Sequence, residues 1–478
     1  MTDPAYRPER AALELDERFY AVVAPADFPE CRVRWRNGRW ASRVGLGSLN
    51  AEEWGAHFGR FAPLDGSLPS PLALAYHGHQ FGHYNPDLGD GRGFLHAQLR
   101  DGEGRLLDLG TKGSGKTPWS RGGDGRLTLK GGVREALAAS YLESLGVYTS
   151  KGFSLVETGE ALHRQDEPSP TRSCVFVRLS HSHIRFGSFQ KHAFANDADA
   201  ISVLTNYCLR NLFPEVSDRD GGPPAVRLFE ASVAASADLA AAWMAAGFVH
   251  GVLNTDNMVM TGESFDYGPW RFLPVSDPNF TAAYFDTAGR YRFGRQPAVV
   301  AWNLAQLAGC FSLVADVREL EAALAGFEAR YRSSFRRQVF ALLGVEQLSE
   351  AEDVDFLQDW FAWMGGCGAS WPQVFFDWFG GGESEQRAFS GPLGGLYQSD
   401  SFRDLRRRLQ VRRPVRPERL SHPYFRRTYP VSCLYDDVER IWGAIARDDD
   451  WSDFYSHMHL IEEAGDALDI RAVRPVDC

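Results

Sequence analysis

The sequence predicts an α+β fold with two lobes. Strand-like segments and one helix dominate the first part of the chain, and the second part is mostly helical. That order is typical of α+β proteins, in which strands and helices are segregated along the chain. The chain has 478 residues, of which 44% are hydrophobic and 13% aromatic, so it can bury the large core of a two-lobed enzyme.

The first part of the chain carries the strand signals. Residues 1–70 are expected to be irregular around the extended, aromatic stretch CRVRWRNGRWASRVG. A hairpin is predicted over 94–112, where FLHAQL and RLLDLGTK flank the turn DGEG. A helix is predicted over 132–146, because GVREALAASYLESLG has helical apolar spacing and ends in a glycine. SCVFVRLS is rich in β-branched and aromatic residues and is predicted to be a strand.

The second part of the chain is predicted to be helical. Residues 197–213 and 232–248 have helical apolar spacing, and GGPP is expected to link them. After residue 249 we expect a loop and a short hairpin. Helical patterns then fill 296–314, 320–343 and 351–364.

Composition excludes several classes of protein. A net charge of −11 argues against broad binding of nucleic acid, which requires a basic surface. The N-terminus is mixed in charge and lacks the pattern of a signal peptide. The most apolar stretch, ASVAASADLAAAWMAAGFVHG, is alanine-rich and carries an aspartate, which favours a buried helix over a membrane span. We expect a cytoplasmic protein with no nucleic-acid or membrane partner.

The chain has 7 cysteines, at 31, 174, 208, 310, 367, 433 and 478, without paired spacing. Scattered cysteines are typical of a reducing compartment and argue against a disulfide framework or a zinc site. YHGHQFGH contains His77, His79 and His83, but no acidic or cysteine partner is near them in the sequence. Structural or nucleotide-side roles are therefore favoured over a metal site.

Residues 110–117, GTKGSGKT, match the phosphate-loop pattern G-x-x-x-x-G-K-[ST]. A true phosphate loop needs a helix that begins directly after it, because the helix N-terminus binds the phosphates. Here PWSRGGDGR follows, and Gly122, Gly123 and Gly125 would disrupt the first turns of such a helix. The match therefore does not predict a P-loop NTPase.

The segment 247–270, GFVHGVLNTDNMVMTGESFDYGPW, is the most informative. MVMTGESF is predicted to form two very short strands around a turn, so that Asn257 and Asp266 lie side by side at the open end of the hairpin. Together they offer the oxygen ligands that Mg²⁺ prefers in nucleotide enzymes. An asparagine and an aspartate that only frame a surface turn would give the same pattern.

HGVLNTDN followed by DYG resembles the protein-kinase pair H-R-D-x-x-x-x-N and D-F-G. Alignment on Asn257 puts His250 at the kinase histidine and Val252 where kinases have their catalytic aspartate. A valine cannot accept a proton. Asp256 is the nearest replacement carboxylate.

Kinase-like enzymes also need a lysine on a strand that reaches the phosphates and a glutamate on a helix that pairs with it. Lys112 ends the strand RLLDLGTK, and Glu135 lies near the start of the next helix. The spacing and order suit this pair. A lysine that is merely solvated at a strand end is the alternative. The earlier LGDGRG, residues 88–93, would bring backbone amides and Arg92 close to the nucleotide.

These motifs together resemble the selenoprotein O family, called YdiU in bacteria. The matching stretches lie between about residues 70 and 310 and are GHQFG, LGDGRG, LGTKGSGKTPWSR, GDGR, SHIRFG, GFVHGVLNTDN, DYGP and GRYRFGRQPAVVAWNLAQLA. Beyond about residue 345 the family pattern is not evident. Family members often carry a selenocysteine or cysteine near the C-terminus. Cys478 is the candidate equivalent, although DIRAVRPVDC differs from the expected tail.

The resemblance implies a protein-kinase-like two-lobed fold that binds ATP in a flipped orientation and transfers AMP to protein hydroxyls. The implied regions are an N-lobe over 1–190, a helical C-lobe over 191–345 and a divergent helical extension over 346–478. Asp256 would accept the proton, Asn257 and Asp266 would bind Mg²⁺ or Mn²⁺, and Glu135 would position Lys112. The implied ATP-binding residues are Gly89, Gly91, Arg92, Lys112, Asp124, Gly125, Arg178, Arg185 and Asp266.

The implied partners are proteins with Ser, Thr or Tyr hydroxyls, redox-related proteins among them. Two rival functions remain, a phosphotransferase that uses Asp256 as its base and a pseudokinase that binds ATP as a structural ligand. Val252 argues against the ordinary kinase, and the intact Lys112, Asn257 and Asp266 argue against the inactive scaffold. Adenylyl transfer agrees with both observations.

Overall fold

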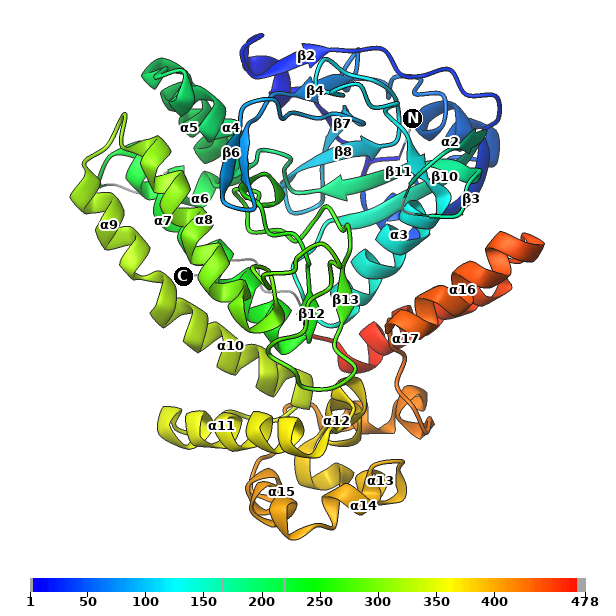
Figure 1. Cartoon of the computed structure of the whole chain (residues 1–478), viewed down its shortest axis with the longest axis vertical. Coiled ribbons are helices and arrows are strands. Elements are labelled where there is room, and N and C mark those ends of the chain that lie inside the picture. The colour runs from blue at the N-terminus through cyan, green and yellow to red at the C-terminus, as the bar shows by residue number, and fades with distance from the viewer. Residues whose placement is uncertain (1–2, 166, 218–220, 471–478) are drawn as a thin grey trace.

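The computed structural model describes residues 3–165, 167–217 and 221–470, and in it an antiparallel sheet lies above a body of helices (Figure 1). Along the sheet the strands follow the order β2-β4-β7-β8-β11-β10-β3, with β1 paired to β7 and β9 paired to β11. Their bounds are β1 Pro8–Glu9, β2 Tyr20–Val22, β3 Arg32–Arg36, β4 Leu72–Leu74, β7 Leu95–Arg100, β8 Leu106–Lys112, β9 Leu127–Thr128, β10 Lys151–Leu162 and β11 Thr171–Ser180. Two short pairs lie outside the sheet, β5 Gly78–Gln80 with β6 His83–Asn85 and β12 Phe248–Val249 with β13 Arg271–Phe272.

Helices cover both faces of the sheet. On one face, α1 (Gly38–Arg43) and α2 (Ala51–Phe58) pack in a core of their own with β7, β8 and β11. On the other, α3 (Leu129–Ser144) packs against β10 and β11. The predicted hairpin of β7 and β8 and the predicted strand β11 are confirmed. The stretch 31–45 was expected to be extended, but only its first half is a strand, because the Asn37 side chain caps α1 by accepting from the Trp40 amide.

Helix α3 confirms the prediction over 132–146 and starts three residues earlier. Thr128 caps it by accepting from the Gly131 amide. Gly146 follows with φ of +77°, the left-handed conformation that ends many helices. The far side of α3 packs against α16 (Tyr435–Asp448) and α17 (Ser452–Leu468).

The helical body begins after β11 and includes the predicted helices. Its bounds are α4 Phe186–Phe194, α5 Ala198–Leu212, α6 Pro214–Ser217, α7 Pro224–Ala245, α8 Gln296–Phe311, α9 Val317–Ala325 and α10 Phe327–Leu343. Helix α7 begins earlier than predicted, because Pro224 at its first turn suits a helix start. The helical pattern over 320–343 is divided into α9 and α10 at Gly326.

A second group of helices fills the C-terminal part of the chain, at the bottom of Figure 1. It comprises α11 Glu350–Cys367, α12 Trp371–Asp377, α13 Glu385–Ser390, α14 Gly394–Tyr397 and α15 Arg403–Gln410. Their apolar side chains form a core with α10 that is distinct from the core beneath the sheet. Within the described residues, no helix is long and apolar enough to cross a bilayer.

The cysteines agree with the prediction of a chain without disulfides. Those at 31, 174, 208, 310, 367 and 433 are free. Cys478 lies outside the described residues.

Candidate active site

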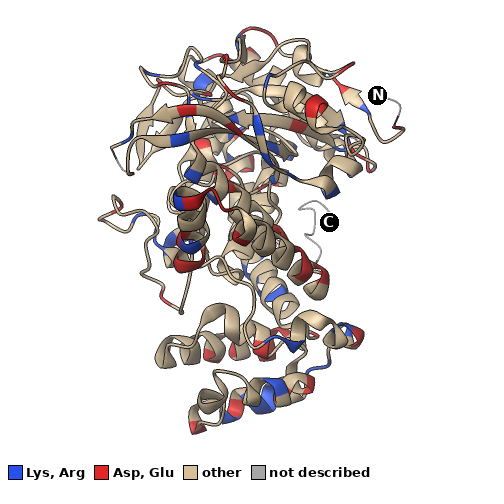
Figure 2. Cartoon of the chain, turned by 90° about the vertical axis from the view of Figure 1, so that its right-hand side faces the viewer, with Lys and Arg blue, Asp and Glu red and all other residues tan. Residues whose placement is uncertain are grey.

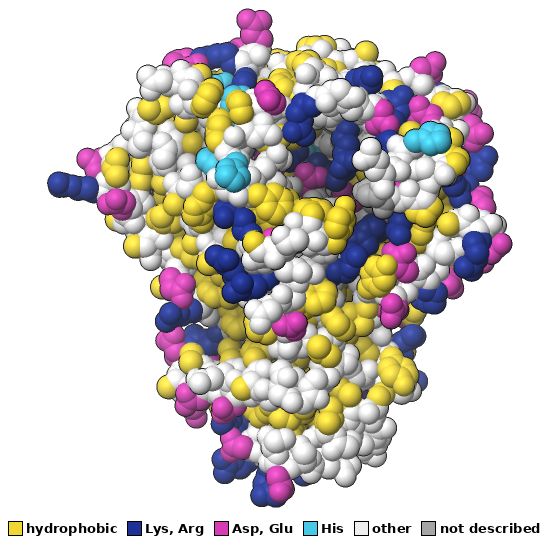
Figure 3. Space-filling model, viewed as in Figure 1, with side chains coloured by type: hydrophobic (Ala, Val, Ile, Leu, Met, Phe, Trp, Pro, Cys, Tyr) yellow, Lys and Arg dark blue, Asp and Glu magenta, His cyan; other side chains and the backbone are white. Residues whose placement is uncertain are grey.

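A cavity of about 590 Å³ lies where the sheet meets the helical body. Figure 3 shows a hollow on this face that opens between basic side chains. Cationic side chains outnumber carboxylates in the lining, although the chain as a whole is acidic. The charged lining residues are Asp90, Arg92, Lys112, Arg121, Asp124, Arg126, Arg164, Arg178, Arg185, Asp256 and Asp266. Such a surface attracts a polyanion such as a nucleotide phosphate chain.

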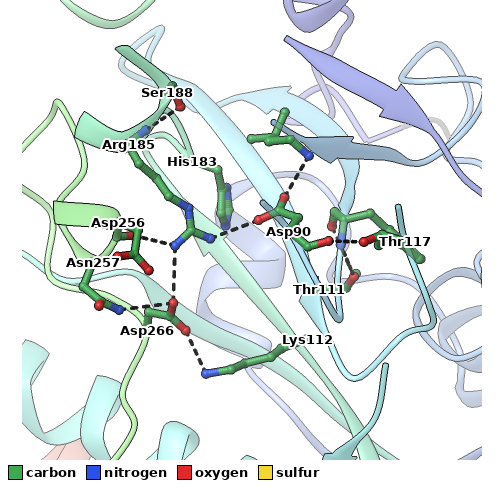
Figure 4. Close-up of polar contacts among 12 residues, drawn as sticks. Asp90, Thr111, Lys112, Thr117, His183, Arg185, Ser188, Asp256, Asn257 and Asp266 are labelled. Carbon is green, nitrogen blue, oxygen red and sulfur yellow. Dashed lines mark hydrogen bonds and ion pairs between the residues drawn. The ribbon is translucent and has the colours of Figure 1, made fainter. Parts of the chain in front are cut away.

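Lys112 is the last residue of β8 and is 7% exposed. Its ammonium pairs with Glu135 of α3. It also donates to Asp266 Oδ1 at 2.8 Å (Figure 4). The structure thus brings together the strand lysine and helix glutamate that the sequence predicted. Because α3 packs beneath β11, and β11 pairs with β8, the sheet itself sets the distance between the two side chains.

Arg178 and Arg185 approach Asp266 from another side. Arg178 on β11 lies 3.5 Å from Asp266 Oδ1, and Arg185 Nη1 lies 3.3 Å from Oδ2. Both guanidinium groups pack on the ring of Phe265, 4.9 and 4.8 Å from its centre. Burial opposes ionisation of Asp266, but Lys112, Arg178 and Arg185 outweigh burial and hold the pKa of this carboxyl well below its usual range.

Asp90 is the second carboxylate that orients Arg185. Its Oδ1 accepts from Arg185 Nη2 at 3.1 Å, and its Oδ2 accepts from the Leu74 amide at 3.0 Å. Arg185 Nη1 also donates to the Asp256 carbonyl at 2.8 Å. Arg185 therefore joins the glycine-rich loop, the segment 254–257 and Asp266, with contacts to all three drawn in Figure 4.

The segment 250–257 carries the kinase-like pattern and is anchored at its start. His250 is buried, its amide donates to Gln296, and its Nε2 lies 3.1 Å from the Phe265 carbonyl. That contact ties the segment directly to the residue before Asp266. Burial lowers the pKa of His250 below its usual range, so the neutral ring is favoured. Val252 is partly buried and packs against the apolar core.

Asp256 and Asn257 lie in a 3-10 turn, Thr255–Asn257, that faces the cavity. Asp256 is 8% exposed, and its Oδ1 has no hydrogen-bond partner in the described part of the chain. Burial raises the pKa of this carboxyl to about 6, with Arg185 acting in the opposite direction. Asn257 Nδ2 donates to Asp266 Oδ2 at 3.4 Å.

The predicted hairpin between Asn257 and Asp266 is wrong, although its ends do meet. Val259 makes its β-bridge with Arg185, and Ser264 makes its bridge with Thr149. The first half of the segment thus pairs with residues that follow β11, and the second half pairs with residues that precede β10. A turn closes between them, in which the Gly262 amide donates to the Val259 carbonyl. The sheet connections therefore bring Asn257 next to Asp266, and Asp266 adopts φ of +64°, a conformation that non-glycine residues rarely take.

The glycine-rich residues of the cavity are required by close packing. A Cβ at Gly89 would lie 2.3 Å from the Trp119 ring, and one at Gly125 would lie 2.3 Å from the Gly115 backbone. Gly89 and Gly91 line the cavity together with the neighbouring Arg92. The two loops are held to each other, because the Gly113 amide donates to the Arg92 carbonyl at 2.6 Å.

The loop after β8 confirms that GTKGSGKT is not a phosphate loop. Residues 113–126 form turns, and the next helix begins only at Leu129. Lys116 is exposed and is absent from the cavity lining. Asp124 and Gly125 do line the cavity, and Asp124 is 2.8 Å from Arg164 across its edge. Burial opposes ionisation of Asp124, but Arg164 and Arg126 outweigh it and lower the pKa of this carboxyl.

Sequence reasoning missed Asp90, Phe265 and Trp119. Asp90 stands between the two glycines of LGDGRG, and Phe265 directly precedes Asp266, so both were adjacent to predicted residues. Neither gave a signal of its own. Their roles arise from side-chain contacts with Arg185 and Arg178 that come from other segments.

The donor set fits a magnesium-like cation. Asp256 and Asp266 line the cavity, and Asn257 Nδ2 donates to Asp266 Oδ2 beside them. No group of three or more His, Cys, Asp or Glu side chains that could hold a metal occurs among the described residues. Mg²⁺ needs no such group, since it is commonly held by one or two carboxylates together with phosphates and water.

The histidines of YHGHQFGH were expected to have structural or nucleotide-side roles, and His77 and His79 have structural contacts. His77 Nδ1 lies 2.7 Å from the Tyr84 hydroxyl, and His79 Nδ1 lies 2.7 Å from Gln190 Nε2. His83 is exposed at the tip of the β5–β6 pair.

Comparisons with known proteins identify a family that matches most of this chain. Residues 5–462 match the profile of the family described as "Protein adenylyltransferase SelO", which extends far beyond the motifs between 70 and 310. A "Protein nucleotidyltransferase YdiU" of Gloeobacter violaceus is 43% identical, covering 94% of this chain and 93% of the relative. The protein of the same name from Synechocystis sp. is 42% identical, covering 95% and 98%. That from Synechococcus elongatus is 50% identical over 71% of this chain and 68% of the relative.

Proposed function

The chain belongs to the protein adenylyltransferase SelO family and is a nucleotidyltransferase, and on that premise we propose that it transfers AMP from ATP to serine, threonine or tyrosine hydroxyls of proteins. Pyrophosphate is the second product. ATP is held in the cavity in a flipped orientation, with its α-phosphate towards the acceptor.

The convergence of Lys112, Arg178 and Arg185 on Asp266 supports this proposal most strongly. The cavity lining as a whole carries more cationic side chains than carboxylates, so positive charge remains available for phosphates. Guanidinium groups suit that task, because their planar donors bind phosphate oxygens in pairs. With ATP flipped, the cations neutralise the pyrophosphate as it leaves.

In the proposed step, the acceptor hydroxyl oxygen forms a bond to the α-phosphorus. The bond from that phosphorus to the oxygen between the α- and β-phosphates breaks, and this oxygen leaves with pyrophosphate. The hydroxyl proton passes to the carboxylate of Asp256, which lines the cavity. Positioning and charge stabilisation provide most of the catalysis. A valine at 252, where a kinase has its base, is compatible with this geometry.

Asn257 and Asp266 would hold Mg²⁺ or Mn²⁺, which neutralises phosphate charge when bound. Glu135 keeps Lys112 directed at the phosphates. Gly89, Gly91 and Gly125 let the backbone approach the nucleotide closely, and Arg92 and Asp124 contact it at the cavity edge.

We further propose that the fold is protein-kinase-like. Its N-lobe contains the sheet and α3 within residues 1–190, and its C-lobe contains α4 to α10 within 191–345. Residues 346–478 form an added helical region. The strand lysine, helix glutamate, Asn257 and Asp266 support this assignment, since kinases place equivalent groups between two lobes.

Intact-protein mass spectrometry after incubation with ATP and Mg²⁺ or Mn²⁺ tests the proposal, with Asp266→Ala as the control. We expect self-modification by a mass equal to AMP that is absent in the control. Addition of a phosphoryl mass would contradict the flipped orientation and favour the kinase. If no mass is added, a lysate is labelled with an ATP analogue tagged on the adenine. Failure to label acceptors there would favour the ATP-binding scaffold.

A further inference from the structure

A strip of aromatic side chains lies on the surface beside the segment 254–257. It includes the most exposed large apolar residues of this region, since Tyr284 is 83%, Phe194 65% and Phe285 47% exposed. Exposed aromatic side chains that cluster are typical of interaction surfaces. We call this surface the aromatic strip and define it as Phe81, Tyr84, Phe194, Tyr284, Phe285 and Trp302.

The strip is continuous over chain segments that are far apart in sequence. Tyr284 and Phe285 are 5.2 Å apart between ring centres, and Phe285 is 5.9 Å from Phe81. His79 connects the other half, lying 5.4 Å from Trp302 and 5.1 Å from Tyr84. Tyr84 in turn stacks on Phe194 at 5.1 Å.

The strip is fixed to the candidate catalytic segment by the β5–β6 pair. The His79 amide donates to Thr255 Oγ1 at 2.7 Å, and the Phe81 amide donates to Asn254 Oδ1 at 3.2 Å. Between them, Gln80 lines the nucleotide cavity. The same short hairpin therefore carries part of the strip and part of the cavity wall, so a protein segment on the strip lies next to the cavity.

Arginines give the strip a positive charge. The Arg290 guanidinium stacks on Trp302 at 4.9 Å, and a Cβ at Gly82 would lie 3.2 Å from its Cζ, so Arg290 joins the two halves of the strip. Arg292 lies in the same loop, next to Gly289. Neither arginine has a carboxylate within ion-pair distance in the described ranges, whereas arginines elsewhere in the chain commonly do. Asp286, in the same loop, is buried and accepts from the Arg290 and Tyr291 amides.

We propose that the aromatic strip, with Arg290 and Arg292, binds the acceptor protein through a segment that carries acidic and apolar residues beside the modified hydroxyl. This inference rests on the proposed adenylyl transfer to proteins. Apolar side chains of the acceptor would cover Phe81, Tyr284 and Phe285, and its carboxylates would pair with the two arginines. Aromatic and arginine side chains contribute most of the binding energy at many protein interfaces, which is the composition found here.

Peptide binding tests the surface independently of catalysis. The probe is a short fluorescent peptide with one serine between phenylalanine and glutamate residues, and its partner probe has lysine in place of glutamate. We expect the wild-type protein to bind the glutamate peptide about tenfold more tightly than the lysine peptide in fluorescence anisotropy. The double variant Arg290→Glu/Arg292→Glu should reverse this preference.

A second variant distinguishes a loss of peptide binding from a loss of the folded structure. Tyr284→Ala removes a side chain that is 83% exposed, so it should weaken peptide binding several-fold while the melting temperature stays unchanged. Matched controls are Tyr429→Ala, which is 63% exposed on another surface, and Arg332→Glu, whose side chain is 75% exposed on α10. Both controls should bind the peptides like the wild type.

Equal binding of the two peptides by the wild-type protein, or unchanged binding by Tyr284→Ala, would overturn the proposal. Binding of anionic phospholipid vesicles that Tyr284→Ala abolishes would also overturn it, because the strip would then contact a membrane. Transfer from adenine-labelled ATP to the glutamate peptide separates the two proposals. If the peptide binds as expected but receives a phosphoryl group, adenylyl transfer fails and the docking surface stands.

Discussion

The nucleotide cavity and the C-terminal helical region bury charge in opposite ways. In the cavity, Lys112, Arg178 and Arg185 share Asp266, and more cations than carboxylates line the space. In the helical region, Arg412 and Asp353 are 1% and 0% exposed and form a closed pair at 2.7 Å. Further ion pairs there lie at the surface, and Figure 2 shows red and blue segments side by side along the lowest helices.

The two regions also differ in how tightly their side chains pack. Trp378 and Phe402 are fully buried in the helical region and lie 5.2 Å apart, and Trp363 is 4.6 Å from Phe402. Such packing stabilises the folded chain. The cavity instead keeps unbalanced charge at a cost in stability, because buried ions lose their hydration. We therefore expect substitutions in the cavity to affect catalysis most and substitutions in the helical core to affect stability most.

Asp266→Asn should have the largest effect. Loss of this carboxylate removes the group shared by Lys112, Arg178 and Arg185 and one of the proposed metal ligands. We expect AMP transfer to fall by about 10³-fold or more, measured by incorporation of labelled adenylate. Asp359→Asn, at a surface ion pair of α11, is the control and should retain full activity. If Asp266→Asn retained activity, catalysis would not depend on the shared carboxylate, and the contrast with the helical region would fail.

Trp378→Ala tests the other side of the comparison. Removing a fully buried indole from the aromatic core should lower the free energy of unfolding by about 3–5 kcal/mol, measured by urea denaturation. The fraction that remains folded should transfer AMP at the wild-type rate. Tyr429→Ala, at a side chain that is 63% exposed, should change stability by less than about 0.5 kcal/mol. A large loss of activity per folded molecule would mean that the two regions are coupled.

Glu135→Gln sharpens the role assigned to the strand lysine. The amide cannot hold the Lys112 ammonium as the carboxylate does, so the lysine is less well directed at the phosphates. We expect a loss of about 10²-fold in kcat. Glu143→Gln, on the same helix but outside the cavity, serves as the control. Equal losses in the two variants would point to a general effect on α3.

A pH effect should appear in the helical region and be the smallest of the four. Asp377 is 1% exposed and accepts from Gln373 and the Tyr397 hydroxyl, each at 2.8 Å. Burial raises the pKa of this carboxyl to about 6 in the folded protein, above its value in the unfolded chain. The folded protein therefore keeps a proton that the unfolded chain releases, so the stability contributed by Asp377 is full at low pH and is lost as pH rises through about 4 to 6.

Asp377→Asn removes this titration. Relative to the variant, the wild-type protein should lose about 2 kcal/mol of unfolding free energy between about pH 4 and pH 7. Urea denaturation of both proteins across this range measures the difference, in which other titrating groups cancel. The exposed Asp355 provides the control substitution, Asp355→Asn. Parallel pH profiles of wild type and Asp377→Asn would show that Asp377 does not titrate in this window.

Much of the local structure and part of the site could be predicted from the sequence. The β7–β8 hairpin follows from turn residues between two apolar stretches, and α3 follows from helical spacing that ends at a glycine. The Lys112–Glu135 pair was predicted because a strand end and a helix start are close in the chain. The break of the pattern 320–343 into α9 and α10 was not, since both helices share the same apolar spacing.

The neighbours Asn257 and Asp266 show the limit of such reasoning. The prediction that they meet is confirmed, but the hairpin that was to bring them together is wrong. Short apolar segments give the same pattern whether they pair with each other or with distant strands. The bridges from Val259 to Arg185 and from Ser264 to Thr149 depend on how the chain enters and leaves the sheet.

By itself, the sequence determined the order of strands and helices, the motifs that mark the family and the residue types available for phosphate and metal. These depend on backbone preferences and side-chain chemistry within short segments. The tertiary structure alone makes Asp90 orient Arg185, makes Phe265 support both arginines, and brings aromatic residues from four segments into one strip. Many of these contacts join residues far apart in the sequence, and their distances are set by the packing of the sheet on the helices, which no local pattern records.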